Sequence, residues 1–338
     1  MAEPTAPPPT APAVAPGPVP TPRASPFSSH AFIIGCARSG TTWTQLLVAQ
    51  HPRVCTSQEN HLFSRYLGEL VSTYDTDARR ERPRGIARFV PREELLALCA
   101  GVADGVFARL AGGAGASDVL LQKIPDVGGD ASLVLSLFPQ AKFVHVVCDP
   151  RAVVASLRGA SKGWGEAWAP HGAGRGARLW RDAVTAARSV REQTDRYLEV
   201  RYEALHADTP GELARVLSFL GLAADEAHCR RAAEACRFDD LKARKAQLRA
   251  PWDVNRQSDG FFRKGVPDGW REELSRTDLR LVEAVAWDLM RTLGYEPVHA
   301  RRPRVTFSAW AHRKLRHLAR QAHRATGRVA QWLDDRTP

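Results

Sequence analysis

Residues 35–43 form the segment of this chain best suited to hold a phosphate. The segment reads GCARSGTTW and lies between the apolar run FII at 32–34 and a stretch of helical period. Gly35 and Gly40 permit a close approach of the backbone, and successive amides at a helix N-terminus converge on an anion. A nucleoside-triphosphate loop carries lysine where this chain has Thr41. The pattern therefore opposes an ATPase or kinase and leaves Arg38 as the cation.

Several segments resemble the sulfotransferases that use 3′-phosphoadenosine 5′-phosphosulfate (PAPS). The turn at 35–43 is similar to the 5′-phosphosulfate loop of that family. Further similar segments follow in the family's order, namely KFVHVVCDPRAVVASL at 142–157, VRYEAL at 200–205, LSFLG at 217–221 and FFRKGVPDGW at 261–270. The resemblance spans residues 31–296. It implies transfer of a sulfuryl group from PAPS to an acceptor hydroxyl, with 3′-phosphoadenosine 5′-phosphate (PAP) as product and no metal.

The resemblance assigns residues to each part of PAPS. At the 5′ end, the amides of residues 39–42, two threonine hydroxyls and an arginine would hold the phosphosulfate at a positive helix end. Trp43 matches the family's adenine-stacking tryptophan, although it could instead be a core residue, and Phe261 would cover the second face of the base. The complete predicted donor-binding set is Arg38, Ser39, Gly40, Thr41, Thr42, Trp43, Ser156, Tyr202, Phe261, Arg263, Lys264 and Gly265.

Two segments outside the turn carry the predicted catalytic groups. Glu59 lies in the sequence QENHLF and resembles the glutamate base of carbohydrate-type sulfotransferases. A carboxylate near the mouth of the turn can accept the proton of an attacking hydroxyl. Cytosolic small-molecule sulfotransferases use histidine, which makes His61 the second candidate. Lys123 ends an apolar run and matches the family's lysine near the departing oxygen, where its ammonium would stabilise charge. Arg38 completes the predicted catalytic set.

One position departs from the family pattern. The residue eight places before the phosphate-binding serine is usually arginine, but this chain has Cys148 there. A charged hydrogen bond to phosphate contributes about 1.5–3 kcal/mol, so we expect weaker donor binding unless Arg151 or Arg158 reaches in.

The pattern of elements predicts a single α/β domain. Short apolar runs at 32–34, 119–121, 142–147 and 197–201 read as buried strands of a mostly parallel sheet flanked by helices. Segments of helical spacing follow at 42–50, 93–110, 152–158, 177–196 and 212–220. We expect a disordered Pro/Ala-rich arm at 1–30, a sulfotransferase domain at 31–296 with a P-loop-like strand, loop and helix, and a basic helical tail at 297–338.

Composition supports a folded protein in the cytoplasm. Hydrophobic residues make up 44% and charged residues 25%, as in globular domains. The six cysteines include no CxxC pair, which disfavours disulfides and structural zinc. No long apolar run or secretory signal is visible in the sequence. We therefore predict a cytoplasmic location, with the further option of a peripheral position at the membrane.

The net charge of +11 lies largely in the tail, where residues 297–333 hold nine Lys or Arg and no Asp or Glu. An apolar stripe from Phe307 to Leu333 predicts an amphipathic helix. That helix would dock on the protein body or on a second subunit of a homodimer, or bind an anionic membrane surface; nucleic acid is disfavoured.

The acceptor is less constrained by the sequence than the donor. Residues 60–118 and 159–176 are expected to form the walls of its pocket, and the second segment has a lid-like composition with Trp164, Trp168 and His171. Hydroxyls of small molecules, carbohydrates, lipids and peptide tyrosines all fit. Two rival functions remain open at this point, namely a P-loop nucleotide kinase or ATPase without the Walker lysine, and a catalytically silent PAPS-binding adaptor.

Overall fold

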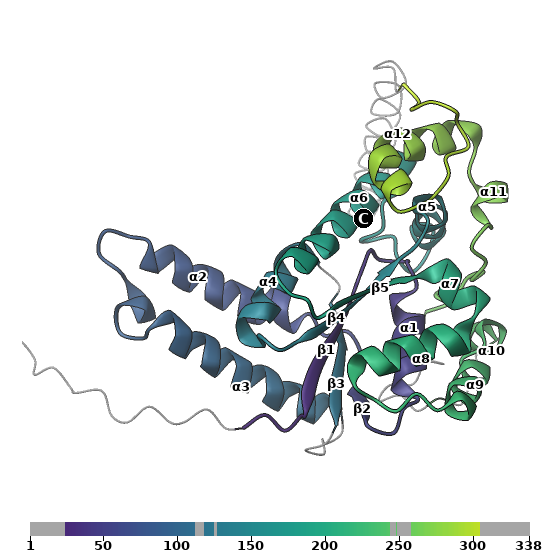
Figure 1. The fold of residues 1–338 in the computed structure, drawn as a ribbon. Coiled ribbons are helices and arrows are strands. Elements are labelled where there is room, and N and C mark those ends of the chain that lie inside the picture. Colours follow the sequence, from purple (N-terminus) through teal and green to yellow (C-terminus); the bar gives the residue numbers. More distant parts are fainter. Residues whose placement is uncertain (1–23, 112–117, 125–126, 244–247, 249–257, 305–338) are drawn as a thin grey trace, which may run out of the picture.

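The computed structural model describes residues 24–111, 118–124, 127–243, 248 and 258–304. The predicted N-terminal arm falls mostly outside these residues, and so does the predicted basic helix of the tail. Within them the chain forms one α/β domain, as expected (Figure 1). No helix of the described part is long and apolar enough to cross a membrane.

A five-stranded parallel sheet forms the centre of the domain, in the order β2-β3-β1-β4-β5. The strands are β1 (Ser29–Ile34), β2 (Val54–Thr56), β3 (Val119–Lys123), β4 (Lys142–Val147) and β5 (Tyr197–Arg201). Ile33 of β1 pairs with Lys123 on one side and with Val144 on the other. β1 is the central strand, with β3 and β2 on one side of it and β4 and β5 on the other. The turn after β1 therefore lies at a topological switch point, where ligands of parallel sheets bind.

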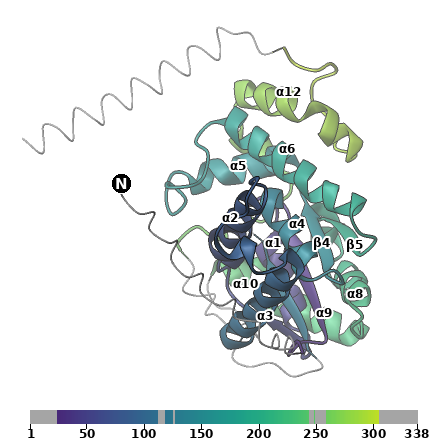
Figure 2. The same ribbon diagram turned by 90° about the vertical axis from the view of Figure 1, so that its left-hand side faces the viewer.

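Helices cover both faces of the sheet (Figures 1 and 2). They are α1 (Thr41–Ala49), η1 (Phe63–Leu67, a π-helical turn), α2 (Gly68–Ala78), η2 (Gly85–Arg88), α3 (Arg92–Leu110), α4 (Val127–Leu137), α5 (Pro150–Ala160), α6 (Ala173–Ser189), η3 (Val190–Glu192), α7 (Tyr202–Ala207), α8 (Thr209–Leu220), α9 (Glu226–Ala235), α10 (Phe238–Lys242), α11 (Trp270–Glu273) and α12 (Arg276–Thr292).

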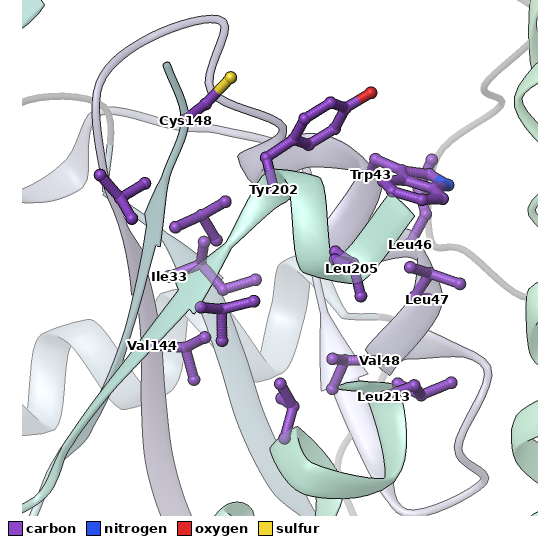
Figure 3. Packing of buried hydrophobic residues seen from close by; sticks show 14 of the residues in the cluster. Ile33, Trp43, Leu46, Leu47, Val48, Val144, Cys148, Tyr202, Leu205 and Leu213 are labelled. Carbon is purple, nitrogen blue, oxygen red and sulfur yellow. The ribbon is translucent and has the colours of Figure 1, made fainter. Parts of the chain in front are cut away.

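Alternate residues of the strands belong to two separate cores. Ile33 and Val144 pack with the leucines of α1, α7 and α8 on one face (Figure 3). Phe32 and Phe143 pack on the other face with η1, α2, α3 and α4. Burial on both faces explains why these strands are continuous apolar runs in the sequence, since neither face meets water.

The predicted elements match the observed ones, with differences at their ends. The run at 119–121 continues as strand to Lys123 because β1 pairs with it that far. The helix predicted at 177–196 instead spans Ala173–Ser189. Its first turn forms despite three nearby glycines because the helix packs closely on α5, where the Cα of Gly176 faces Val154. Its end comes early because β5 must begin at Tyr197 to pair with β4.

α2 and α3 form a helical hairpin that extends away from the sheet (Figure 1). The η1 turn connects this hairpin to the segment that carries Glu59 and His61. The hairpin therefore begins beside the predicted catalytic residues, and the connection between its two helices lies far from the sheet (Figure 1).

Candidate active site

The turn after β1 has the backbone geometry that its glycines predict. Gly35 and Gly40 have φ values of 149° and 96°. A Cβ at Gly40 would collide with the ring of Tyr202, so only glycine fits this close approach. The hydroxyl of Ser39 donates to the carbonyls of Cys36 at 2.7 Å and Val146 at 3.1 Å. The amide of Ser39 also donates to Cys36. Ser39 is therefore used to hold the turn and does not line the cavities described below.

Arg38 connects the turn to two distant segments. Its Nε donates to the hydroxyl of Ser156 at 3.1 Å, and its Nη2 donates to the carbonyl of Phe261 at 2.6 Å. The guanidinium also lies over the rings of Phe261 and Trp164. Burial, together with repulsion from Arg263, lowers the pKa of Arg38 to about 10. A buried arginine whose charge is disfavoured in this way is well placed to be stabilised by a bound anion.

A first cavity lies between the turn and residues 261–266. Its lining includes nearly all of the predicted donor-binding residues, from Arg38, Gly40, Thr41, Thr42 and Trp43 to Ser156, Tyr202, Phe261, Arg263, Lys264 and Gly265. The hydroxyl of Tyr202 donates to the carbonyl of Gly265 at 2.7 Å and so fixes the second segment over the first. Segments 223 positions apart in the sequence thus form one concave site.

Two cations in this cavity share a carboxylate that the sequence analysis did not single out. Glu273 lies 2.6 Å from Arg263 and 3.1 Å from Lys264. Burial opposes its ionisation, but hydrogen bonds from these two cations hold the pKa of Glu273 below its usual value. The Nε of Arg263 is buried and has no hydrogen-bond partner among the described residues. An anionic ligand would supply that partner, so the donor set fits a phosphate.

Aromatic side chains line the same cavity. Trp43 is only 7% exposed, and its indole nitrogen donates to the carbonyl of Cys236 at 2.9 Å. Its ring meets Tyr202 edge-on (Figure 3). Phe238 and Phe262 also line the cavity, and no sequence pattern indicated a role for Phe238. The tryptophan is thus both a packed residue and a wall of the cavity.

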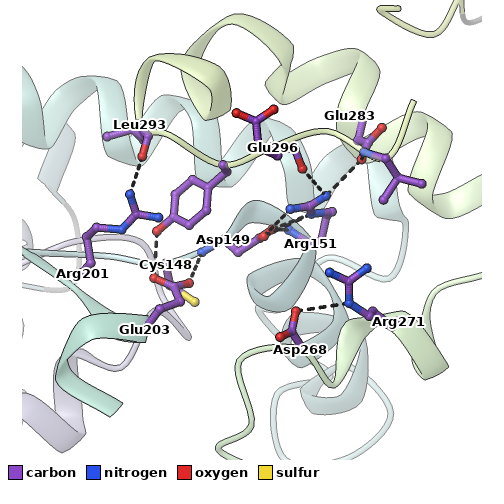
Figure 4. A network of polar contacts seen from close by, with 12 residues as sticks. Cys148, Asp149, Arg151, Arg201, Glu203, Asp268, Arg271, Glu283, Leu293 and Glu296 are labelled. Carbon is purple, nitrogen blue, oxygen red and sulfur yellow. Dashed lines mark hydrogen bonds and ion pairs between the residues drawn. The ribbon is translucent and has the colours of Figure 1, made fainter. Parts of the chain in front are cut away.

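Neither of the arginines that could replace the missing family arginine reaches the cavity. Cys148 lines it and is 3% exposed. Arg151 instead pairs with Asp149 at 2.6 Å and with the fully buried Glu283 at 3.2 Å (Figure 4). Arg158 pairs with Asp278 on α12. Burial first, then the nearby carboxylate of Glu203, raises the pKa of the Cys148 thiol well above its usual value. It is therefore a neutral thiol.

A second cavity, of about 410 Å³, opens on the other side of Arg38 and contains the predicted catalytic groups. Lys123 forms an ion pair with Glu59 at 2.6 Å and donates to the hydroxyl of Thr42 at 3.1 Å. His61 lies 3.6 Å from the other carboxylate oxygen of Glu59. His61 has a φ of 54°, and the only other non-glycine residue with positive φ in the described part is Arg38. Backbone strain of this kind concentrates at functional sites.

The walls of the second cavity are largely apolar. Trp164, Trp168 and Ile124 line it together with Phe261, and Arg65 is a charged residue of the same wall. The two tryptophans come from the segment expected to act as a lid, with ring centroids 5.4 Å apart. His171 of that segment is not among the lining residues. The cavity therefore suits an acceptor with a sizeable apolar part.

Comparisons with known proteins bear on the family and the fold of this chain. A family model described as the sulfotransferase family matches residues 31–226. The mouse sulfotransferase SULT7A1, crystallised with PAP, superposes with a TM-score of 0.52 at 13% identity, covering 78% of this chain and 85% of that one. No curated protein matches the sequence.

Two further similar structures are sulfotransferase domains. One comes from the curacin biosynthetic pathway, with a TM-score of 0.49, 16% identity and coverage of 79% and 98% of the two chains. The other belongs to the olefin synthase of Synechococcus PCC 7002, with a TM-score of 0.47, 21% identity and the same coverage of 79% and 98%.

Proposed function

Since the chain belongs to the sulfotransferase family, we propose that it transfers the sulfuryl group of PAPS to the hydroxyl of an acceptor. One observation carries the proposal. The two cavities share Arg38, Thr41, Thr42 and Phe261, so the predicted donor site opens directly onto the site of Glu59 and Lys123. A donor and an acceptor bound on the two sides would meet at the turn after β1.

The donor cavity has suitable groups for both charged ends of PAPS. The turn and the N-terminus of α1 would hold the 5′-phosphosulfate, with Arg38 as the nearest cation. Arg263, Lys264 and the hydroxyl of Ser156 would hold the 3′-phosphate. Phosphate binding there would draw the two cations away from Glu273, which pairs with both of them and offsets one of their two charges. Trp43 and Phe261 would contact the adenine.

The proposed reaction is an in-line displacement at sulfur. The acceptor oxygen forms a bond to sulfur while the bond from sulfur to the bridging 5′-phosphate oxygen breaks, and PAP leaves with that electron pair. Glu59 accepts the proton of the acceptor hydroxyl. The ammonium of Lys123, which contacts both Glu59 and Thr42, lies between the base and the turn. It would stabilise the charge that develops on the leaving oxygen.

The first experiment identifies the activity. The protein is incubated with PAPS labelled in the sulfuryl group and with a cell extract, and mass spectrometry searches for products that have gained SO₃. Calorimetry with PAP and with Mg-ATP measures binding separately. We expect PAP to bind and labelled products to form. Binding of Mg-ATP with no affinity for PAP would support a nucleotide kinase or ATPase, and PAP binding without any transfer would support a silent adaptor.

The assignment of the base is tested with Glu59→Gln. We expect this variant to lose about 10²–10⁴-fold in kcat, because it removes the proton acceptor, while its affinity for PAP stays the same. His61→Asn is the matched comparison on the same wall of the cavity. If His61→Asn shows the large loss and Glu59→Gln does not, histidine is the base and the assignment of Glu59 is wrong.

A further inference from the structure

The connection between α2 and α3 has an unusual composition. Residues 79–92, here called the hairpin tip, read RRERPRGIARFVPR and contain six arginines and one glutamate. The tip lies at the outer end of the projecting hairpin in Figure 1. It is separate from the basic tail, which lies outside the described residues. None of its residues lines the two cavities of the candidate active site.

Exposed apolar side chains lie among these arginines. Phe89 is 76% exposed and Ile86 is 47% exposed, so the tip presents apolar surface to the solvent. The guanidinium of Arg88 lies 5.4 Å from the centroid of Phe89. Exposed apolar side chains that lie together and are surrounded by polar residues can mark a site of membrane or protein interaction.

Most of the positive charge of the tip is unpaired. Arg80 and Arg92 form ion pairs with Asp77 and Asp75, at 3.2 Å and 2.8 Å, and so attach the tip to α2. The other four arginines have no carboxylate partner among the described residues; they are Arg79, Arg82, Arg84 and Arg88. Six arginines and one glutamate give the tip a net charge of +5, which the neighbouring acids Asp75, Asp77, Glu93 and Glu94 offset only in part.

The shape of the tip is defined by contacts with the helices. The hydroxyl of Tyr74 on α2 donates to the carbonyl of Val90 at 2.6 Å. Gly85, with a φ of 56°, begins the short helical turn η2 that carries Ile86 and Arg88. These contacts present the apolar and basic side chains on a formed loop, so little ordering is required when a partner binds.

We propose that the hairpin tip docks on an anionic membrane surface. Acidic headgroups would pair with the free arginines, while Phe89 and Ile86 would enter the boundary between headgroups and acyl chains. This combination favours a lipid surface over nucleic acid, because a phosphate backbone offers charge but no apolar layer for a phenylalanine. α2 has 11 residues and is about 16 Å long, and η1 before it lines the acceptor cavity through Arg65. Docking would thus hold that cavity close to the membrane.

The test is co-sedimentation of the full chain with vesicles of phosphatidylcholine alone and of phosphatidylcholine with phosphatidylserine. We expect binding only to the anionic vesicles, and weaker binding as salt is raised. In the double variant Arg82→Gln/Arg84→Gln, the partition coefficient should fall about 20- to 30-fold, because each arginine near an anionic surface strengthens membrane binding about fivefold and two are removed. Phe89→Ser should weaken binding at high salt as well, because its contribution is not electrostatic.

A matched control removes the same number of positive charges from a different surface of the protein. Arg175→Gln/Arg178→Gln changes two exposed arginines on α6, and Leu179→Ser there parallels Phe89→Ser. These variants should bind anionic vesicles as the unchanged protein does. Melting temperatures confirm that each variant is folded.

Three outcomes would overturn the proposal. The first is equal binding to neutral and anionic vesicles, or no binding to either. The second is a loss no larger in the tip variants than in the α6 variants, which would place the membrane contact elsewhere. The third is loss of binding to a DNA duplex in the tip variants without any loss of vesicle binding, which would make the tip a nucleic-acid surface. Because these measurements need no PAPS, their failure leaves the proposed transferase activity untouched.

Discussion

Cys148 is the residue at which this chain departs most clearly from the pattern of its family. The structure shows it on the wall of the donor cavity, with both nearby arginines engaged in ion pairs elsewhere. The 3′-phosphate would therefore rely on Arg263, Lys264 and Ser156.

Cys148→Arg should increase the affinity for PAP. A charged hydrogen bond contributes about 1.5–3 kcal/mol, which corresponds to a gain of about tenfold or more. Calorimetry with PAP and with adenosine 5′-phosphate measures the effect, and the second ligand should show no gain because it lacks the 3′-phosphate. Cys148→Ser serves as the control of similar size. Equal gains for both ligands would show that the new arginine does not act on the 3′-phosphate.

Arg38 should make PAP binding sensitive to pH at the alkaline end. Burial lowers its pKa to about 10, and a bound anion favours the charged guanidinium. The affinity should therefore be constant below this value and fall as the pH rises through about 10. Calorimetry between pH 8 and pH 10.5, in buffers of different ionisation enthalpy, would detect the accompanying proton uptake. The Arg38→Gln variant should bind more weakly throughout and lose this component of the pH dependence.

At the scale of elements, the donor site depends on the segment 261–266, which is almost without regular structure. Hydrogen bonds from Arg38 to Phe261 and from Tyr202 to Gly265 hold it over the turn after β1. The contacts of its two cations with Glu273 fix it to α11. Because a loop has no internal ladder of hydrogen bonds, its position depends on these contacts and on how closely neighbouring side chains pack against it.

Gly265→Ala should weaken this arrangement. Gly265 has a φ of 70°, and a Cβ there would collide with the ring of Phe238. We expect the unfolding free energy to drop by about 1–3 kcal/mol and PAP binding to weaken at the same time. Gly101→Ala on α3 is the control, since a Cβ there would meet no atom from another part of the chain, and alanine is favoured over glycine in a helix by about 0.5–1 kcal/mol. Urea unfolding and calorimetry would record both quantities. A Gly265→Ala protein as stable as the parent would mean that the loop does not need this conformation.

At the scale of the whole molecule, one bound nucleotide should connect regions far apart in the sequence. If PAP bridges the turn after β1 and the segment before α11, both should be protected together from hydrogen exchange. Peptides covering 35–43 and 261–266 should exchange more slowly with PAP, while those of the hairpin tip should not change. Mass spectrometry of exchanged peptides checks this, with adenosine as the comparison ligand that lacks both phosphates. Protection of only one of the two regions would contradict a site that grips both ends of the nucleotide.

The strands, the helices and the turn after β1 could be predicted from the sequence because each leaves a pattern in neighbouring residues. β4 coincides with the predicted run 142–147, and α1 begins within one residue of its predicted start. A strand buried on both faces leaves a continuous apolar run, and a glycine-bounded turn between strand and helix leaves its spacing in neighbouring residues. The predicted residues of the donor cavity, Ser39 excepted, line one cavity in the structure, but they lie in distant segments that the family resemblance identified rather than a local pattern.

Tertiary structure alone decided the pairings between segments far apart in the chain. Three contacts depend on how the fold brings distant segments together: Lys123 pairs with Glu59, Glu273 pairs with two predicted phosphate ligands, and Phe238 lines the donor cavity. The partner of Arg151 also depends on the fold. Arg151 is close in sequence to the position of the missing arginine, but in the structure it pairs with Glu283 on α12. Periodicity and spacing predict which face of a helix or strand is buried. The partner of a charged side chain depends instead on which segments the fold brings close to it.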